Sequence, residues 1–136
     1  MSEEAVLFSR LTGDAAIAAI VGTRVYPVEA PEGAALPHLV YRLVSDGRVR
    51  AMTTDTGVTP RRVQITAKAA GFDGVAALAN AVKAALKDWR DPASNPVVMG
   101  CAFETAFDGF DERRSPAAGG AGSYRRNLDF LITYRS

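Results

Sequence analysis

The sequence predicts an α+β fold in which a mostly antiparallel β-sheet carries one long helix on a face and follows a broken N-terminal helix. Apolar residues recur at helical spacing between residues 75 and 89, and several other segments alternate apolar and polar residues, as half-buried strands do. A chain of 136 residues, 48% of them hydrophobic, is long enough to form one core. We therefore expect a single domain over residues 1–136.

The first helix is predicted to begin after Ser2. This residue is a suitable N-cap, and two glutamates follow it in the first turn, where the helix dipole favours negative charge. Val6, Leu7 and Leu11 share one face of the helix.

A second, short helix is predicted immediately afterwards. Asp14 can cap it, Ile17, Ile20 and Val21 form its apolar stripe, and Gly22 stands where helices end with a glycine. The two pieces together form the broken N-terminal helix.

Strands are predicted on both sides of an irregular, proline-bearing connection. A short strand over residues 24–26 ends at Pro27, and a longer one runs from His38 to Ser45, with Leu39, Tyr41 and Leu43 on one face. Residues 48–60 have weak periodicity and are expected to form a long hairpin loop or a ragged strand pair. The alternation of "RRVQITAKA" then predicts a strand with one solvated face.

The long helix is predicted over "GFDGVAALANAVKAALKDW". Asp73 is a natural N-cap, Phe72 can pack back as a hydrophobic staple, and the apolar stripe continues to Trp89. Such a helix would span about 25 Å and could lie across the sheet.

Two strands are predicted at the end of the chain. The first, "VVMGCAFETAFDGF", would place on one side Val97, Met99, Cys101, Phe103 and Phe107. The last runs from Tyr124 to Arg135, alternates except at Leu131, and at about 40 Å is long enough to be central to the sheet or to project beyond it. Between them, the small residues of a loop at about 111–123 predict flexibility.

The glycine-rich loop does not have the pattern of a nucleotide-binding loop. Phosphate loops place their glycines between a strand and a helix, so that backbone N–H groups and the helix dipole converge on the anion. Here "GGAGSYRR" leads into a strand and contains neither of the usual glycine motifs. We therefore expect no nucleotide at this loop.

No residue set predicts catalysis, a metal site or a cofactor. Cys101 is the only cysteine and lies in an apolar run, which favours packing as a small hydrophobic residue, and His38 is the only histidine. One cysteine and one histidine do not make the usual four-ligand zinc set. The carboxylates from Asp108 to Glu112 stand beside two arginines, which favours surface ion pairs over acid–base catalysis.

The charge pattern is local rather than global. The formal net charge is +1, but thirteen of the sixteen basic residues are arginine and many are paired in the sequence. Such pairs can be solvated surface charges, or they can face phosphate, which the planar guanidinium binds well. No apolar run reaches the roughly 20 residues that span a bilayer, and the first residues lack the basic region of a signal peptide. We expect a soluble protein made in the cytoplasm.

Three segments carry a resemblance to a known family: "LTGDAAIAAIVGTRVYPVEAPEGAALPHLVYRLVS", "RRVQITAKAAGFDGVAALANAVKAAL" and "YRRNLDFLITY". They cover almost the whole chain, and the first includes the short motifs V-G-x-R-V-Y-P and L-P-H-L-V-Y. The chain resembles the phage tail completion or tail-terminator proteins, which also occur in prophages and gene transfer agents.

The resemblance implies a structural virion protein and not an enzyme. Such subunits close into a six-fold ring on the head-proximal end of the tail tube, stop tube growth and present a docking face to the head connector or stopper protein. The implied partners are further copies of the chain, the tail tube protein, the connector and double-stranded DNA bound without sequence specificity, with no membrane. The implied location is the head–tail junction of a particle assembled in the bacterial cytoplasm.

Charge and periodicity supply the candidate contact residues. We expect the DNA-facing lumen to be lined by Arg48, Arg50, Arg113 and Arg114. A subunit or tube interface is expected at Tyr124, Arg125, Arg126 and Tyr134. A neck or head-completion protein of the same particle and a small DNA-binding module remain open as alternatives.

Overall fold

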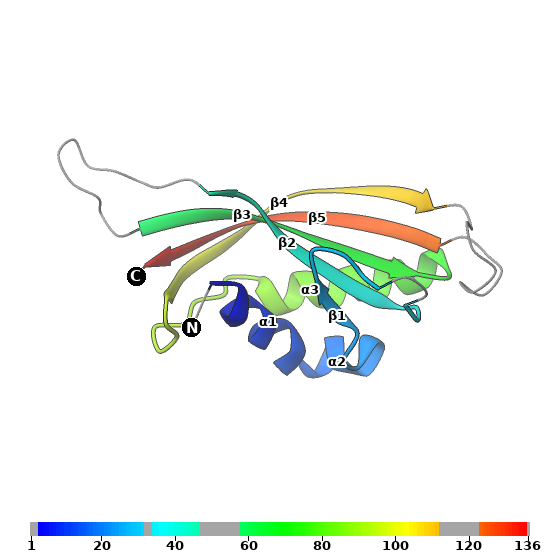
Figure 1. Cartoon of the computed structure of the whole chain (residues 1–136), viewed down its shortest axis with the longest axis horizontal. Helices are drawn as coiled ribbons and strands as arrows, with labels where there is room; N and C mark the ends of the chain where they lie inside the picture. Colours follow the sequence, from blue (N-terminus) through cyan, green and yellow to red (C-terminus); the bar gives the residue numbers. More distant parts are fainter. Residues whose placement is uncertain (1–2, 32–33, 47–57, 112–122, 136) are drawn as a thin grey trace.

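The computed structural model describes residues 3–31, 34–46, 58–111 and 123–135, which form one layer of helices against one sheet. The helices all lie on the same side of the sheet, below it in Figure 1, so no described helix covers the other side. In chain order the elements are α1 (Glu3–Gly13), α2 (Ala15–Val21), β1 (Val25–Pro27), β2 (His38–Asp46), β3 (Val58–Ala69), α3 (Phe72–Leu86), β4 (Val97–Asp111) and β5 (Ser123–Arg135).

The α+β class is confirmed, but the sheet is mixed rather than mostly antiparallel. Its strand order is β1-β2-β3-β5-β4, and β1 runs parallel to β2, with Val25 opposite Leu39 and Pro27 opposite Tyr41. The pair is parallel because β2 begins at the same end of the sheet as β1, so the connection after Pro27 has to return to that end. The pairs β2–β3, β3–β5 and β5–β4 are antiparallel.

The predicted break between α1 and α2 is confirmed, together with its capping residues. The side chain of Asp14 accepts a hydrogen bond from the backbone N–H of Ile17 at 3.1 Å. Gly22 ends α2 with φ of 59°, and its N–H donates to the carbonyl oxygen of Ala18 at 2.8 Å. A positive φ is accessible to glycine without strain, which explains its position here.

Replacement of Gly22 by alanine is therefore expected to lower the free energy of unfolding by about 1 kcal/mol or more. A Cβ at this position would have open space around it, so the effect comes from the backbone conformation alone. Gly13→Ala is the matched control, because its Cβ also meets nothing within 4 Å and its φ is not positive. Urea denaturation of both variants measures the difference, and equal stability of the two would contradict this explanation.

Helix α3 begins before its predicted N-cap and ends before Trp89. Its N-cap is Gly71, whereas Asp73 lies in the first turn, and no side-chain hydrogen bond caps the helix. The helix ends at Leu86 because Lys87 is extended and Asp88 adopts a φ of 53°. Trp89 therefore lies beyond the helix, yet it remains only 4% exposed.

The predicted apolar side of β4 is only partly correct, because Cys101 and Phe103 share the inner face but Met99 and Phe107 do not. Pairing with β5 is irregular between Val98 and Gly100 and again between Phe103 and Thr105, and each extra residue shifts the alternation of faces. As a result Val98 is buried, whereas Met99 is 41% exposed and Phe107 is 50% exposed. The sequence pattern does not reveal where such bulges fall.

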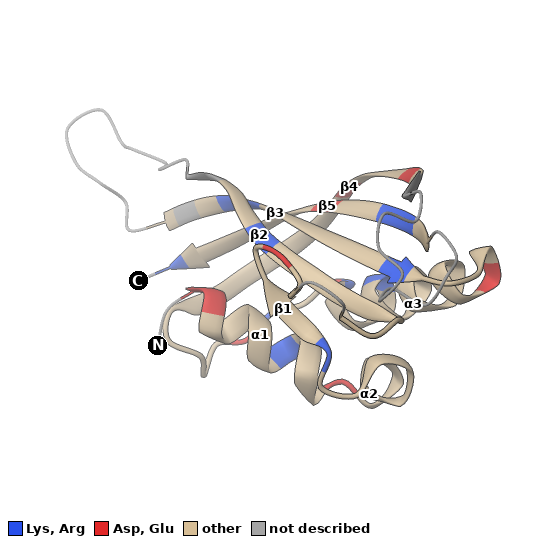
Figure 2. Cartoon of the chain, turned by 45° about the vertical axis from the view of Figure 1, so that its right-hand side comes forward, with Lys and Arg blue, Asp and Glu red and all other residues tan. Residues whose placement is uncertain are grey.

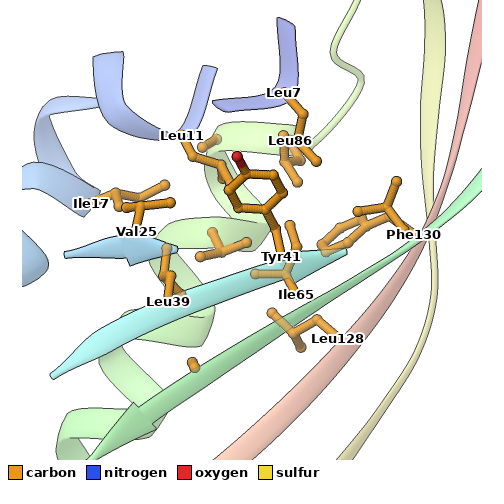
Figure 3. Packing of buried hydrophobic residues seen from close by; sticks show 14 of the residues in the cluster. Leu7, Leu11, Ile17, Val25, Leu39, Tyr41, Ile65, Leu86, Leu128 and Phe130 are labelled. Atoms are coloured by element: carbon orange, nitrogen blue, oxygen red, sulfur yellow. The ribbon is translucent and has the colours of Figure 1, made fainter. Parts of the chain in front are cut away.

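The core lies between the helices and the inner face of the sheet. Figure 3 shows Tyr41 of β2 close to Leu11 and Leu86, while Phe130 of β5 lies over the neighbouring strands. The predicted inward face of β2 is thus confirmed at Leu39 and Tyr41. Full burial of a large apolar side chain stabilises a protein by about 1.5–3 kcal/mol, so this layer fixes the helices on the sheet.

Strand β5 is an interior strand of the sheet. Its length predicted either this central position or a strand that projects beyond the sheet. It lies between β3 and β4, with Leu128, Phe130, Ile132 and Tyr134 buried on its inner face. The hydroxyl of Tyr134 donates to the carbonyl oxygen of Glu3 at 3.4 Å. The strand therefore contacts the first turn of α1.

Candidate interaction surfaces

The four arginines predicted to face DNA lie outside the described residues: Arg48, Arg50, Arg113 and Arg114. Their role stays a prediction. The other four candidates all lie on β5, where successive side chains point to opposite faces of the sheet.

The structure separates these β5 candidates. Tyr124 and Arg126 lie on the helix side near the β4 edge, and Arg125 lies on the side without helices, opposite Gly109. Tyr134 is only 1% exposed, so it is part of the core of this chain.

Exposed aromatic side chains lie at two places along the helix side of β5, one at Tyr124 and the other beside Phe130, six residues further along the strand. The Tyr124 ring meets that of Phe72 edge-on, with centroids 6.1 Å apart and an interplanar angle of 82°. Phe103 of β4 packs against Phe130 with centroids 5.5 Å apart. We call Phe72, Lys83, Phe103, Tyr124 and Arg126 the β4-edge patch.

Two cations stand over the rings of this patch. The guanidinium of Arg126 lies 5.6 Å from the Phe72 centroid, and the ammonium of Lys83 lies 4.8 Å from the Phe103 centroid. Arg126 also donates two hydrogen bonds to the carboxylate of Asp108, at 2.6 and 3.3 Å. This hydrogen bond holds the pKa of Asp108 below its usual range and raises that of Arg126.

The patch remains exposed because the helix layer does not extend over β4. Helix α3 packs on β3 and β5, while β4 forms the outer edge of the sheet beside β5. Three aromatic side chains are consequently solvent-exposed: Phe72 by 51%, Phe103 by 47% and Tyr124 by 37%. Adjacent exposed aromatic side chains are typical of binding surfaces.

The side of the sheet without helices is polar and basic. Arg42 donates to the Gln64 side-chain oxygen at 2.6 and 3.0 Å, and the Thr66 hydroxyl bonds the Asn127 oxygen at 2.7 Å. Figure 2 shows basic segments distributed over the central strands. Strand register and these contacts place on this open face the cations Arg42, Arg62, Lys68, Arg125 and Arg135 and the carboxylates Glu104 and Asp129.

A cleft of about 520 Å³ lies between α1, the start of α2 and the segment after Trp89. Two of its polar side chains bond the backbone: Arg10 donates to the Ala85 carbonyl at 2.9 Å, and the Ser94 hydroxyl donates to the Asp91 carbonyl at 2.9 Å. Among the described residues, no three histidine, cysteine, aspartate or glutamate side chains gather as a metal site. None of the described helices is long and apolar enough to cross a membrane.

The thiol of Cys101 has the environment of a packed side chain. Burial raises its pKa to about 12, so very little thiolate is present near neutral pH. We expect iodoacetamide at pH 8 to modify the folded chain at least about tenfold more slowly than the urea-unfolded chain, because the thiolate is the reacting species. Mass spectrometry follows the reaction, and equal rates in the two states would contradict the assigned environment.

His38 is a buried titratable group at the start of β2. It is 5% exposed, and its Nδ1 lies 3.1 Å from the Ala35 carbonyl oxygen. Burial lowers its pKa from the ordinary 6.5, and the nearby positive charges of Lys68 and Arg24 lower the pKa further. The hydrogen bond to Ala35 raises the pKa but does not offset these effects.

A histidine with a lowered pKa is expected to destabilise the folded chain in acid. Below about pH 6.5 the unfolded chain binds a proton that folded His38 does not, so the free energy of unfolding decreases as pH falls. Denaturation of wild type and His38→Gln between pH 5 and 8 measures this effect. The variant should show the weaker pH dependence, and identical curves would contradict the prediction.

The sequence did not reveal the β4-edge patch as a whole. The alternation of the last strand indicates Tyr124 and Arg126, but the sequence pattern predicts Phe72 as a helix staple and Phe103 as part of an apolar strand face. Two features of the sequence could have indicated the patch. One is the large apolar residue Phe72 at the start of the predicted helix, and the other is the aromatic residues of the strand that follows that helix. Only the pairing of β4 with β5 brings these positions together.

Comparison with known proteins gave a family match and matches among solved structures. A family model described as "Tail completion protein gp17" matches residues 5–134. A chain in a solved structure titled "Virion of native gene transfer agent (GTA) particle" is similar, with a TM-score of 0.69 and 26% sequence identity. The similarity covers 99% of this chain and 96% of that one. No curated protein sequence matched.

Proposed function

This chain belongs to the tail completion protein gp17 family, and we propose that it forms a ring that ends the tail tube and joins the tail to the head connector. The single observation that carries the proposal is the family match, which spans residues 5–134 and so includes every helix and strand except the first two residues of α1 and the last residue of β5. The similarity to a chain of a gene transfer agent virion supports a structural role in a tail. The proposed role requires no catalytic residue and no cofactor.

Ring formation is supported by the edges of the sheet. A closed ring needs two different surfaces on each subunit, placed so that one meets the other on the next copy. Strand β1 forms one edge of the sheet and β4 forms the other, and β4 extends over fifteen residues without lysine, arginine or proline to discourage pairing. The proposed partners are further copies of the chain, the tail tube protein and the head connector or stopper.

Passage of double-stranded DNA through the ring is supported by the charge of the open sheet face. The described residues of that face include five cations and two carboxylates. Arginine and lysine contact phosphates without reading sequence, which suits DNA that moves along its own axis. Arg48, Arg50, Arg113 and Arg114 remain candidates for the lumen. The proposed location is the head–tail junction of a phage-like particle assembled in the bacterial cytoplasm.

Two other functions would use the same features. A neck or head-completion protein would bind the connector rather than the tube, and a small DNA-binding module would use the arginines as a monomer. The DNA-binding alternative predicts that the monomeric chain binds a duplex tightly. Its affinity should then fall on the order of a thousandfold between 50 and 200 mM salt. The ring proposal predicts weak binding by the monomer, because each copy contributes few phosphate contacts.

Tube growth provides the test of termination. Purified tail tube protein is polymerised with and without a substoichiometric amount of this chain, and tube lengths are measured by electron microscopy. We expect short tubes that stop growing when the chain is present. Unchanged length distributions, combined with binding to purified connector, would favour the neck alternative. Unchanged lengths with no association to either partner would contradict both.

A further inference from the structure

We propose that the β4-edge patch of one copy receives Val28 and Glu29 of a second copy, and that this head-to-tail contact builds the ring. The inference rests on the proposed function and names the surfaces that it uses. It is carried by the exposed aromatic patch, the backbone conformation of Val28, the charges of both surfaces and their positions in the sheet.

The patch provides the receiving surface. Phe72, Phe103 and Tyr124 present aromatic area from α3, β4 and β5, and each is more than a third exposed. Their arrangement is fixed by the edge-on contact of Phe72 with Tyr124 and by the packing of Phe103 on Phe130. Rigid aromatic surface loses little side-chain entropy on binding, which suits it to an interface.

The charges of the patch favour a carboxylate from the partner. Lys83 and Arg126 supply two positive charges, and Asp108 balances one of them through its paired hydrogen bonds to Arg126. The ammonium of Lys83 lies 4.8 Å from the centroid of the Phe103 ring, one of the exposed aromatic side chains. A carboxylate reaching this ammonium would lie beside the exposed Phe103 ring of β4.

Val28 provides the inserting side chain. It is 67% exposed and has a φ of 66°, a backbone region that β-branched residues rarely adopt. The conformation is held by its N–H, which donates to the Tyr41 carbonyl oxygen at 2.8 Å. Strain of this kind persists where the surroundings enforce it and often marks a functional position.

Glu29 supplies the matching charge next to Val28. Its side chain is exposed, and its N–H donates to the Pro27 carbonyl oxygen at 2.7 Å, which tightens the turn after β1. An apolar side chain and a carboxylate are thus presented together on a short, hydrogen-bonded segment. This pair complements an aromatic patch that contains a lysine.

The two surfaces lie at opposite edges of the same sheet. Val28 directly follows β1, and the patch lies beside β4, with three strands between these edges. Contact between unlike surfaces repeats from copy to copy and can close into a ring. Contact of the patch with itself would instead give a two-fold dimer and would bring the two Lys83 side chains toward each other.

Charge reversal tests this pairing. Tail tubes are mixed with wild type, Lys83→Glu, Glu29→Lys or the double variant, and the fraction of tube ends bearing a ring is counted by negative-stain microscopy. Each single variant should lower this fraction at least about tenfold, because like charges then face each other at every contact. The double variant should recover to within about twofold of wild type. Lys87→Glu, an exposed reversal just beyond α3, is the matched control and should behave as wild type.

The outcomes distinguish the interface from the function. Rings that persist in both single variants would overturn the inference and leave the proposed function standing. Loss of rings in the single variants without recovery in the double variant would also overturn it, and would assign the patch to the tube protein or the connector. Absence of rings with wild type would overturn the proposed function and this inference together. Thermal unfolding of each variant, expected to match wild type, shows that the fold is retained.

Discussion

Replacement of Phe130 by alanine is expected to lower the free energy of unfolding by about 3–5 kcal/mol. Phe130 is 1% exposed on the inner face of β5, and Figure 3 shows it among the side chains that join the sheet to the helices. Truncation removes its buried apolar area and leaves a cavity that rigid neighbours fill only in part. Such a loss is a large share of the roughly 5–15 kcal/mol that stabilises a typical domain.

Phe107→Ala is the matched control for this prediction. Phe107 is 50% exposed on the open face of β4, so its truncation leaves no comparable cavity and should cost less than about 1 kcal/mol. Guanidinium denaturation followed by far-UV circular dichroism measures both variants. Similar losses for the two would mean that the helix side of the sheet is not the core.

Replacement of Trp89 by alanine is expected to have a similarly large effect, a loss of about 3–5 kcal/mol. Trp89 is 4% exposed, and the guanidinium of Arg10 lies 5.7 Å from its ring centroid while donating to the Ala85 carbonyl. The ring therefore joins α1 to the end of α3. Its loss should loosen α1 from the rest of the fold.

Two further variants separate packing from other effects at this position. Trp89→Phe keeps most of the apolar contact and should lose less than Trp89→Ala, and Lys87→Ala, at an exposed position, should change stability little. Circular dichroism is the suitable probe because Trp89 is the only tryptophan and its fluorescence is lost with it. An alanine variant as stable as wild type would show that α1 is held elsewhere.

Local signals predicted the helical part of the fold well. The capping side chain of Asp14 and the glycine at position 22 are effects of a few neighbouring residues, and both act as the sequence indicated. The burial of Trp89 was also predicted, although the helix ends before it, because the apolar stripe reports which side chains face the core and not where the backbone turns.

The errors concern features that depend on distant parts of the chain. The parallel pairing of β1 with β2 depends on the path of the connection between them, and the shifts of the alternation along β4 depend on two irregularities against β5. A one-residue slip exchanges every inward and outward side chain beyond it, so periodicity alone could not place Phe107.

The candidate contact residues were predicted only in part. Tyr124 and Arg126 emerged from the alternation of the last strand, and both lie in the β4-edge patch. Phe72 and Lys83 could not be added because they reach the patch from α3, more than forty residues earlier in the chain. The strained backbone of Val28 has no counterpart in the sequence pattern, since valine there resembles any other loop residue.

Negative-stain imaging of the purified chain mixed with tail tubes tests the central claim most directly. The proposed role predicts six-fold rings that cap one end of each tube. Rings are expected even where the free chain is monomeric, because a ring subunit can assemble on its partner. A chain that never associates with tube ends, at concentrations where the tubes themselves remain intact, would contradict it.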